Sequence, residues 1–233
     1  MSCSRPQVSH LLLALSAVPI IAGCVRLAQL ATGALDSSSA RFLQAPWPVT
    51  LHILAATVFS VLGAFQIDPR RRGHALGWHR SAGAVALVSG LVVAVTGAHM
   101  TVAYSIPTTL QGPLLRVTRL TVSAAMLVSL LLALRAINKR RFQFHGRWML
   151  RAYALGSGAG TQVIVFLPAG LLLAGQPQGL PRDVLMAAAW GLNLAVAEIV
   201  IRRSSMQRLA RSKADAGQLD QRSQAHFLRR GAS

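Results

Sequence analysis

Four of the seven histidines lie at the ends of long apolar stretches, where an imidazole could bind a metal or a cofactor: His52, His79, His99 and His145. The charge distribution described below places His79 and His145 near one membrane face, and His52 and His99 near the other. A helix bundle can hold a porphyrin iron between imidazoles from facing helices. The most specific chemistry that the sequence predicts is therefore one b-type haem ligated by His79 and His145.

Helix geometry separates His99 from the other three histidines. At 100° per residue, His99 lies about 160° around the helix from His79, so it points away from the face that His79 occupies. The other three histidines each share a face with mainly small side chains: His79 with Gly83, Gly90 and Gly97, His145 with Met149, Ala152 and Gly156, and His52 with Ala56, Phe59 and Gly63. Such faces can admit a flat macrocycle or let two helix backbones touch.

The haem hypothesis has a structural alternative. If a haem is bound, Arg80 and Arg147 are available to its propionates, and His52 is a further candidate ligand. In the alternative, His79 and His145 mark the membrane interface, where they hydrogen-bond headgroups and water beside the two arginines. The residue types fit both.

Glu198 is the one carboxylate deep in an apolar stretch of the sequence, and such a group should have a partner or a function. Arg151 lies at a matching depth in the neighbouring stretch, so a structural ion pair between Arg151 and Glu198 is expected. The functional alternative is a non-enzymatic module or transporter that uses Arg151, Glu198 and Asn193 as a buried polar site. Gln162 is a further polar candidate in the middle of a span.

Other signatures of catalysis are absent from the sequence. It has no H-E-x-x-H pair, P-loop, C-x-x-C or nucleophile elbow. Cys3 and Cys24 are too few for a disulfide framework or a zinc site. The glycine-rich run 156–160 lies inside an apolar stretch, so it is expected to let helices approach closely rather than to bind phosphate. Whether the protein is an enzyme is left open.

A membrane domain must position these side chains. Of the 233 residues, 53% are hydrophobic and 13% are charged, and the mean hydropathy is +0.47. Basic residues sit in short clusters between apolar runs, so nucleic-acid binding is not expected. Six stretches are long enough to cross a bilayer core about 30 Å thick. They cover roughly residues 11–30, 49–67, 81–104, 117–136, 148–174 and 184–201, and the fifth is expected to bend or end early because it carries Pro168.

Lysine and arginine predict the orientation. Eighteen of the 24 fall on one side of the six stretches, three fall on the other side, and three lie inside them. Because cytoplasmic loops retain positive charge, both termini are expected in the cytoplasm and the protein in the bacterial inner membrane. The predicted fold is an all-α transmembrane six-helix bundle over residues 11–201, preceded by a cytoplasmic segment 1–10.

Both ends of the chain leave alternatives open. The tail 202–233 carries eight basic residues and is predicted to be a disordered cytoplasmic arm or a weak surface helix. It either binds anionic lipid headgroups or only enforces the topology. Ile21-Ala22-Gly23-Cys24 also resembles a lipoprotein signal with a lipidated cysteine, which would leave five spans.

The glycine face of residues 83, 90 and 97 would serve a homodimer as well as a monomer's core.

Motifs along most of the chain carry a family resemblance. They are Leu51-His52-Ile53, Leu62-Gly63-Ala64-Phe65-Gln66, His79-Arg80-Ser81-Ala82-Gly83, His145-Gly146-Arg147-Trp148-Met149-Leu150-Arg151 and Trp190-Gly191-Leu192-Asn193-Leu194-Ala195-Val196-Ala197-Glu198. Over roughly residues 49–202 the chain resembles the bacterial predicted membrane proteins of domain of unknown function 2306.

The resemblance implies a multi-pass membrane protein without an assigned activity. It singles out the residues that match the family's motifs: His52, His79, Arg80, His145, Arg147, Arg151, Asn193 and Glu198. The family tends to carry an arginine midway along the fifth span, where this chain has Gln162.

Overall fold

All regular structure in the described residues is helical. The computed structural model describes residues 8–34, 39, 41–67, 76–172 and 175–230. The elements are α1 (Val8–Thr32), α2 (Arg41–Gln44), α3 (Pro46–Ile67), α4 (Leu76–Ala103), α5 (Pro113–Asn138), α6 (Phe142–Gly156), α7 (Gly158–Leu172) and α8 (Gly179–Arg230). The chain divides into two compact units, Met1–Leu194 and Ala195–Ser233. The predicted all-α class is confirmed.

Most of these helices are long and apolar enough to cross a membrane. Within the described residues, five pass this criterion: α1, α3, α4 from Gly77, α5, and the Gly179–Arg208 part of α8. α6 and α7 pass it together but are bent by 41° at their junction, and they make a sixth span if they count as one. Large apolar side chains such as Val88 and Leu131 are 58% and 49% exposed, a surface that lipid solvates and water does not. These features agree with the predicted multi-pass architecture.

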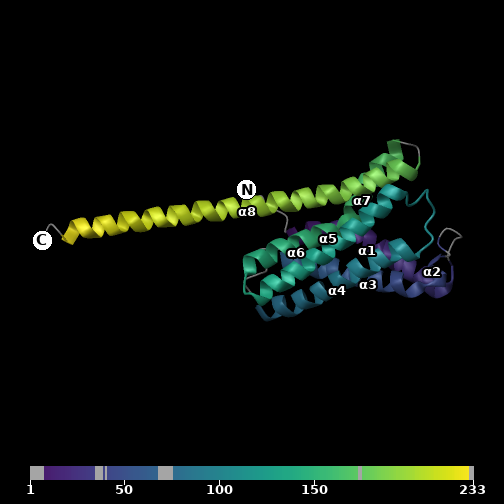
Figure 1. The fold of residues 1–233 in the computed structure, drawn as a ribbon, viewed down its shortest axis with the longest axis horizontal. Coiled ribbons are helices and arrows are strands. Elements are labelled where there is room, and N and C mark those ends of the chain that lie inside the picture. The colour runs from purple at the N-terminus through teal and green to yellow at the C-terminus, as the bar shows by residue number, and fades with distance from the viewer. Residues whose placement is uncertain (1–7, 35–38, 40, 68–75, 173–174, 231–233) are drawn as a thin grey trace, which may run out of the picture. The chain divides into compact units, whose positions relative to one another are not determined.

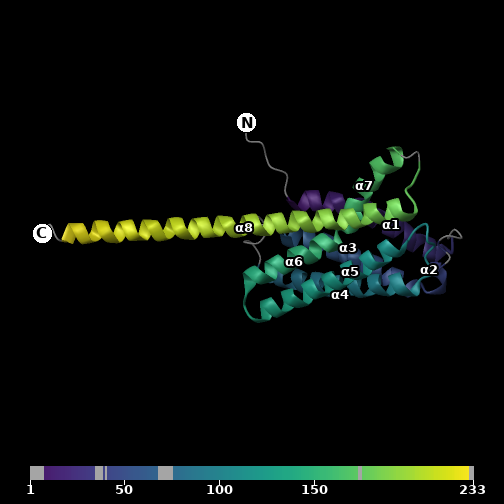
Figure 2. The same ribbon diagram turned by 45° about the horizontal axis from the view of Figure 1, so that its top comes forward.

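Four helices form the packed centre of the first unit. α3, α4, α5 and α6 lie side by side (Figures 1 and 2), with α3 against α4, α4 against α5, α5 against α6, and α6 back against α3. α1 packs against α3 and α7. The core contains Phe59 from α3, Met126 and Leu130 from α5, and Tyr153 from α6, all buried. Large side chains therefore fill the space where these helices meet.

The small-residue faces predicted from the sequence are packed faces. A Cβ atom at Gly90 would lie 2.8 Å from the Phe59 ring, and one at Gly156 would lie 2.6 Å from the same ring. A Cβ atom at Gly63 would overlap the Tyr153 ring. Each large ring thus lies against a glycine of the next helix, which lets the backbones approach closely. On α4, Gly90 packs within the chain in this way.

The turns around α5 follow their sequence signals. α5 begins with Pro113 after Gly112, whose φ of −76° and ψ of 178° are extended, and proline suits the first helical position because it lacks an N–H group. After Asn138, Arg140 takes a left-handed φ of 55°, and the Arg141 N–H donates to the Ala136 carbonyl over 2.8 Å. α6 begins at once after this turn, so α5 and α6 are antiparallel neighbours.

The fifth stretch bends at a different place from the one expected. The break lies at Ser157, between α6 and α7, whereas Pro168 stays inside α7. Gly-Ser-Gly has a low helix propensity, and α7 ends about one turn after Pro168, where a missing hydrogen bond has little effect.

A helix is one of the two states predicted for the basic tail, and the described part of the tail is helical. α8 continues as one helix through residues 202–230, the segment for which disorder or a weak surface helix is predicted. Its cytoplasmic location stays a prediction.

Candidate functional site

The α6–α7 break is the irregular backbone nearest the middle of a candidate span. Both α6 and α7 have 15 residues, so Ser157 lies halfway along the bent pair. The Ser157 N–H donates to the Tyr153 carbonyl over 2.8 Å, and the Gly160 N–H donates to the Ser157 carbonyl over 3.1 Å. Carbonyl groups that lose their helical donors inside a membrane must find others, because lipid offers none.

Two side chains of α8 donate to these carbonyls, and the Ser157 hydroxyl also donates to the Ala154 carbonyl over 3.1 Å. The Asn193 amide donates to the Ala154 carbonyl over 3.0 Å, and the Trp190 indole N–H donates to the Leu155 carbonyl over 3.2 Å. Trp190 and Asn193 are three residues apart, so they lie on one face of α8. This explains physically why these two residue types occur at this spacing.

The same asparagine also joins the two halves of the broken helix. Its amide nitrogen lies 3.4 Å from the Ser157 hydroxyl oxygen, and its amide oxygen accepts a 2.6 Å hydrogen bond from the Thr161 hydroxyl on α7. Asn193 therefore contacts the end of α6, the break and the start of α7. Both its amide nitrogen and its amide oxygen are therefore hydrogen-bonded at this break.

Glycines around the break provide close contacts, as the sequence predicted. A Cβ atom at Gly158 would overlap the Trp190 indole, and one at Gly160 would overlap the Leu15 carbonyl of α1. A side chain at either position would push α7 away from its neighbour. The run 156–160 thus serves packing.

Gln162 brings an unpaired donor to this region. Its amide nitrogen Nε2 is buried and has no hydrogen-bond partner among the described residues. A buried donor without an acceptor costs free energy comparable to a lost hydrogen bond. Gln162 is therefore the group near the break with spare capacity to bind a ligand.

The predicted Arg151–Glu198 pair stays a prediction. Arg151, on α6, has its guanidinium carbon 4.5 Å from the centroid of the Trp148 ring, a cation–π contact. Glu198 belongs to the second unit, so its relation to Arg151 is not described.

Two of the candidate histidines, His145 and His52, are held by side-chain hydrogen bonds within the bundle. His145 Nδ1 lies 3.0 Å from the Ala133 carbonyl oxygen, which can only accept, so Nδ1 carries the proton. His52 Nδ1 lies 2.9 Å from the Thr96 hydroxyl, whose hydrogen is already donated to the Val92 carbonyl over 2.6 Å, so His52 Nδ1 is also the donor.

These contacts do not assemble a metal centre. The described residues contain no group of three or more histidine, cysteine or acidic side chains placed to hold a metal ion. Arg80 is exposed, and the Arg147 guanidinium carbon lies 5.4 Å from the Phe144 ring centroid. The exposed His99 lies beside Trp47, with ring centroids 5.1 Å apart. The haem hypothesis for His79 and His145 gains no support from this geometry and stays a prediction.

Asp183 is a structural residue that the sequence analysis missed. It is 1% exposed, and its carboxylate oxygens accept hydrogen bonds from the Gly112 N–H over 3.1 Å and the Leu115 N–H over 3.0 Å. An acidic side chain at a helix N-terminus satisfies free N–H groups and complements the helix dipole. Here the capping side chain comes from α8 instead of from the residue before α5. The absence of a capping side chain at Gly112-Pro113 was the available signal.

Comparison with known proteins identifies a family. A family model described as a predicted membrane protein, DUF2306, matches residues 49–201. The matched region contains the α6–α7 break together with Asn193, Asp183 and the motif histidines. No curated protein and no solved structure matches the chain. The chain therefore belongs to the DUF2306 family of predicted membrane proteins, as its motifs predicted.

Proposed function

We propose that this protein is a non-enzymatic membrane module, best described as a transporter, that binds a small polar solute at the α6–α7 break. The observation that carries the proposal is the pair of hydrogen bonds from α8 to that break. Asn193 donates to the Ala154 carbonyl, and Trp190 donates to the Leu155 carbonyl. We further propose that both termini face the cytoplasm, in line with the arginine and lysine asymmetry.

The physical case begins with the position of the break. In secondary transporters, solute sites lie near the bilayer midplane at discontinuous helices, whose ends present backbone dipoles. The α6–α7 break resembles such a discontinuity, because it lies halfway along a bent pair of helices that is long enough to cross a bilayer. Irregular backbone is tolerated at such depth only where protein or a polar cavity surrounds it.

The chemistry of the break indicates the class of solute. The polar side chains around it are neutral hydrogen-bonding groups: Ser157, Thr161, Gln162 and Asn193. The spare donor is the Gln162 amide. A neutral solute with an oxygen acceptor fits this set, because it would accept from Gln162 and compete with the Ala154 carbonyl for the Asn193 amide.

Cysteine accessibility tests the proposal. In a Cys3→Ser, Cys24→Ser background, Ser157→Cys and Thr161→Cys are each treated in vesicles with a hydrophilic, membrane-impermeant maleimide. The matched control is Ile164→Cys on α7, which is 61% exposed on the apolar surface. We expect labelling at positions 157 and 161 and none at 164, because a solute path admits water and a lipid-facing position does not. If none of the three cysteines is labelled, the break is closed to water, and this result would contradict a solute path.

A further inference from the structure

Five arginines gather at the end of the first unit where α4 ends and α5 begins. They are Arg26 of α1, Arg41 of α2, Arg116 and Arg119 of α5, and Arg182 of α8, and we call them the arginine cluster. On the predicted topology this is the outer end, where positively charged residues are disfavoured. Their presence there needs a physical reason.

Aromatic rings connect two members of the cluster to the end of α4. The guanidinium carbons of Arg26 and Arg41 lie 5.2 Å and 4.5 Å from the centroid of the Phe42 ring. That ring meets Tyr104 edge to face, with centroids 5.3 Å apart. The Tyr104 hydroxyl donates to the Ala45 carbonyl over 2.7 Å.

The loop between α4 and α5 holds two further arginines. Arg119 donates to the Gln111 amide oxygen over 2.5 Å, and Arg182 Nε donates to the Leu110 carbonyl over 3.2 Å. These bonds orient both guanidinium groups toward the same short segment of the chain. The acceptors in these bonds are neutral, so the bonds themselves add no negative charge to balance the arginines.

Acidic residues do not balance this charge. Asp183 is the one carboxylate that the described residues place here, and its two oxygens already accept from the Gly112 and Leu115 N–H groups. Asp36, in the segment between α1 and α2, lies outside the described residues. Among the described residues, five arginines therefore gather beside one aspartate.

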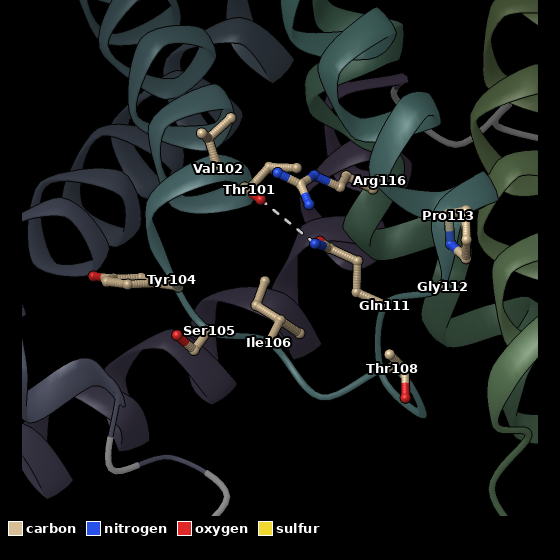
Figure 3. Close-up of a pocket in the computed structure, with 10 residues that line it drawn as sticks. All are labelled: Thr101, Val102, Tyr104, Ser105, Ile106, Thr108, Gln111, Gly112, Pro113 and Arg116. Carbon is tan, nitrogen blue, oxygen red and sulfur yellow. Dashed lines mark hydrogen bonds between the residues drawn. The ribbon is translucent and has the colours of Figure 1, made fainter.

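A pocket opens beside the cluster. It has a volume of about 340 Å³, and its polar lining comes from Thr101, Tyr104, Ser105, Thr108, Gln111 and Arg116. Figure 3 shows the Arg116 and Gln111 side chains extending toward Thr101 on the facing helix, whereas the Tyr104 side chain points away from them. The Tyr104 and Thr101 hydroxyls already donate to backbone carbonyls, so the donors that the pocket offers to a ligand are the Arg116 guanidinium, the Ser105 and Thr108 hydroxyls and the Gln111 amide.

An unsatisfied donor gives a second, independent indication of a ligand. Nη1 of Arg26 is buried and has no hydrogen-bond partner among the described residues. A buried guanidinium nitrogen without an acceptor is costly, and an anion supplies the missing acceptor. Guanidinium groups match the oxygens of phosphate in charge and geometry.

We infer that the arginine cluster and the adjoining pocket form a binding site for a phosphate group. Arg116 and Gln111 contact the phosphate directly from the pocket wall. Arg41, Arg119 and Arg182 add to the positive potential, and Arg26 contributes its unpaired Nη1. The site lies apart from the α6–α7 break and does not depend on solute binding there.

The experiment measures binding to the full-length protein in a neutral detergent by isothermal titration calorimetry. The probes are dihexanoylphosphatidylglycerol, which is a short anionic lipid, and sn-glycerol 3-phosphate, which carries the phosphate without acyl chains. The variants are Arg116→Gln, Arg26→Gln and the charge-retaining Arg116→Lys. The matched control is Arg135→Gln, an exposed arginine at the other end of α5.

We expect Arg116→Gln and Arg26→Gln each to weaken phosphate binding about tenfold, the effect of one lost charge-assisted hydrogen bond. Arg116→Lys should weaken it less, and Arg135→Gln should bind like the parent protein.

The two probes distinguish the sources of the phosphate. Binding of both supports a site open to soluble phosphate compounds, and binding of the lipid alone supports a headgroup site. The proposal is overturned if neither probe binds, or if Arg135→Gln weakens binding as much as Arg116→Gln. Arg116 is exposed, so its glutamine variant keeps the test valid even if Arg26→Gln fails to fold.

Discussion

Asn193 satisfies more of the α6–α7 break than any other described side chain. Its amide bonds to the Ala154 carbonyl, the Ser157 hydroxyl and the Thr161 hydroxyl. The sequence singled it out through the family motif, but it could not say what the amide contacts. Those contacts depend on which face of α8 meets the break, and a single helix pattern does not determine that face.

Replacement of Asn193 by leucine should destabilise the protein. The change removes one of the two side-chain donors of the Ala154 carbonyl and the acceptor of the Thr161 hydroxyl, so we expect a loss of about 1–2 kcal/mol in the free energy of unfolding. The measurement is unfolding in mixed micelles by SDS titration. Leu192→Ala, at an exposed neighbouring position on α8, is the control and should cost less. Equal losses would mean that Asn193 contributes only general packing.

Gly158 should tolerate no side chain. A Cβ atom there would overlap the Trp190 indole, so we expect Gly158→Ala to cost about 1–3 kcal/mol. Gly191→Ala on α8 is the matched control, because no atom lies within 4 Å of the added Cβ. Combining Gly158→Ala with Trp190→Phe should recover part of the loss if the clash is with the larger ring. A double variant as unstable as the sum of both changes would argue against this contact.

An absorption spectrum separates the haem hypothesis from the solute-site proposal. The haem hypothesis predicts a Soret band in protein from haem-replete cells, shifted by dithionite and lost in His79→Ala or His145→Ala. The solute-site proposal predicts a colourless, folded protein. Because His145 Nδ1 is bonded to the Ala133 carbonyl, only its Nε2 would be available to iron. A Soret band in the parent protein that is absent from both the His79→Ala and the His145→Ala variants would establish the haem hypothesis.

At the scale of elements, apolar length predicted the helices and tertiary contacts decided where they bend. Five of the six predicted stretches each fall within one helix to within a residue, because Pro and Gly mark the connectors, whereas the fifth stretch spans both α6 and α7. The bend was expected near Pro168 but lies at Ser157, where α8 side chains bind the freed carbonyls. A proline is visible in a sequence, whereas a donor from another helix is not.

The start of α5 depends on α8 in the same way. Asp183→Ala removes the acceptor of the Gly112 and Leu115 N–H groups, so we expect a loss of about 2 kcal/mol and fraying of the first turn of α5. Hydrogen exchange should rise at residues 112–116 and stay unchanged at the other end of α5. Asp183→Asn keeps one good acceptor and should have a smaller effect. Uniform exchange along α5 in the alanine variant would contradict a cap.

For the molecule as a whole, the two ends of the bundle carry unlike amounts of positive charge. The sequence predicts this asymmetry, with 18 basic residues on one side and three on the other. It did not predict that Arg26 and Arg119, which lie within spans, join the outer arginines in one cluster. Linear spacing gives the depth of a residue but not its neighbours around the bundle.

Hydrogen bonds indicate that the bent pair runs from one end of the bundle to the other. α6 begins just after the end of α5, at Phe142. The start of α8 is bonded to the beginning of α5, through the Gly179 N–H to the Thr109 carbonyl over 3.0 Å and through Asp183 to Gly112. The chain between these points therefore traverses the length of α5, which supports a broken span over a re-entrant loop.

Topology reporters test this crossing and the orientation together. We expect fusions at Gly73, Asn138 and the C-terminus to report cytoplasm, and fusions at Gln111 and Gln178 to report periplasm. The decisive comparison is between Asn138 and Gln178, which flank the bent pair. Opposite sides mean that α6 and α7 cross the membrane, whereas the same side means that they re-enter. In the second case the basic tail would lie in the periplasm, against the charge asymmetry, so a periplasmic C-terminus would refute the six-span topology.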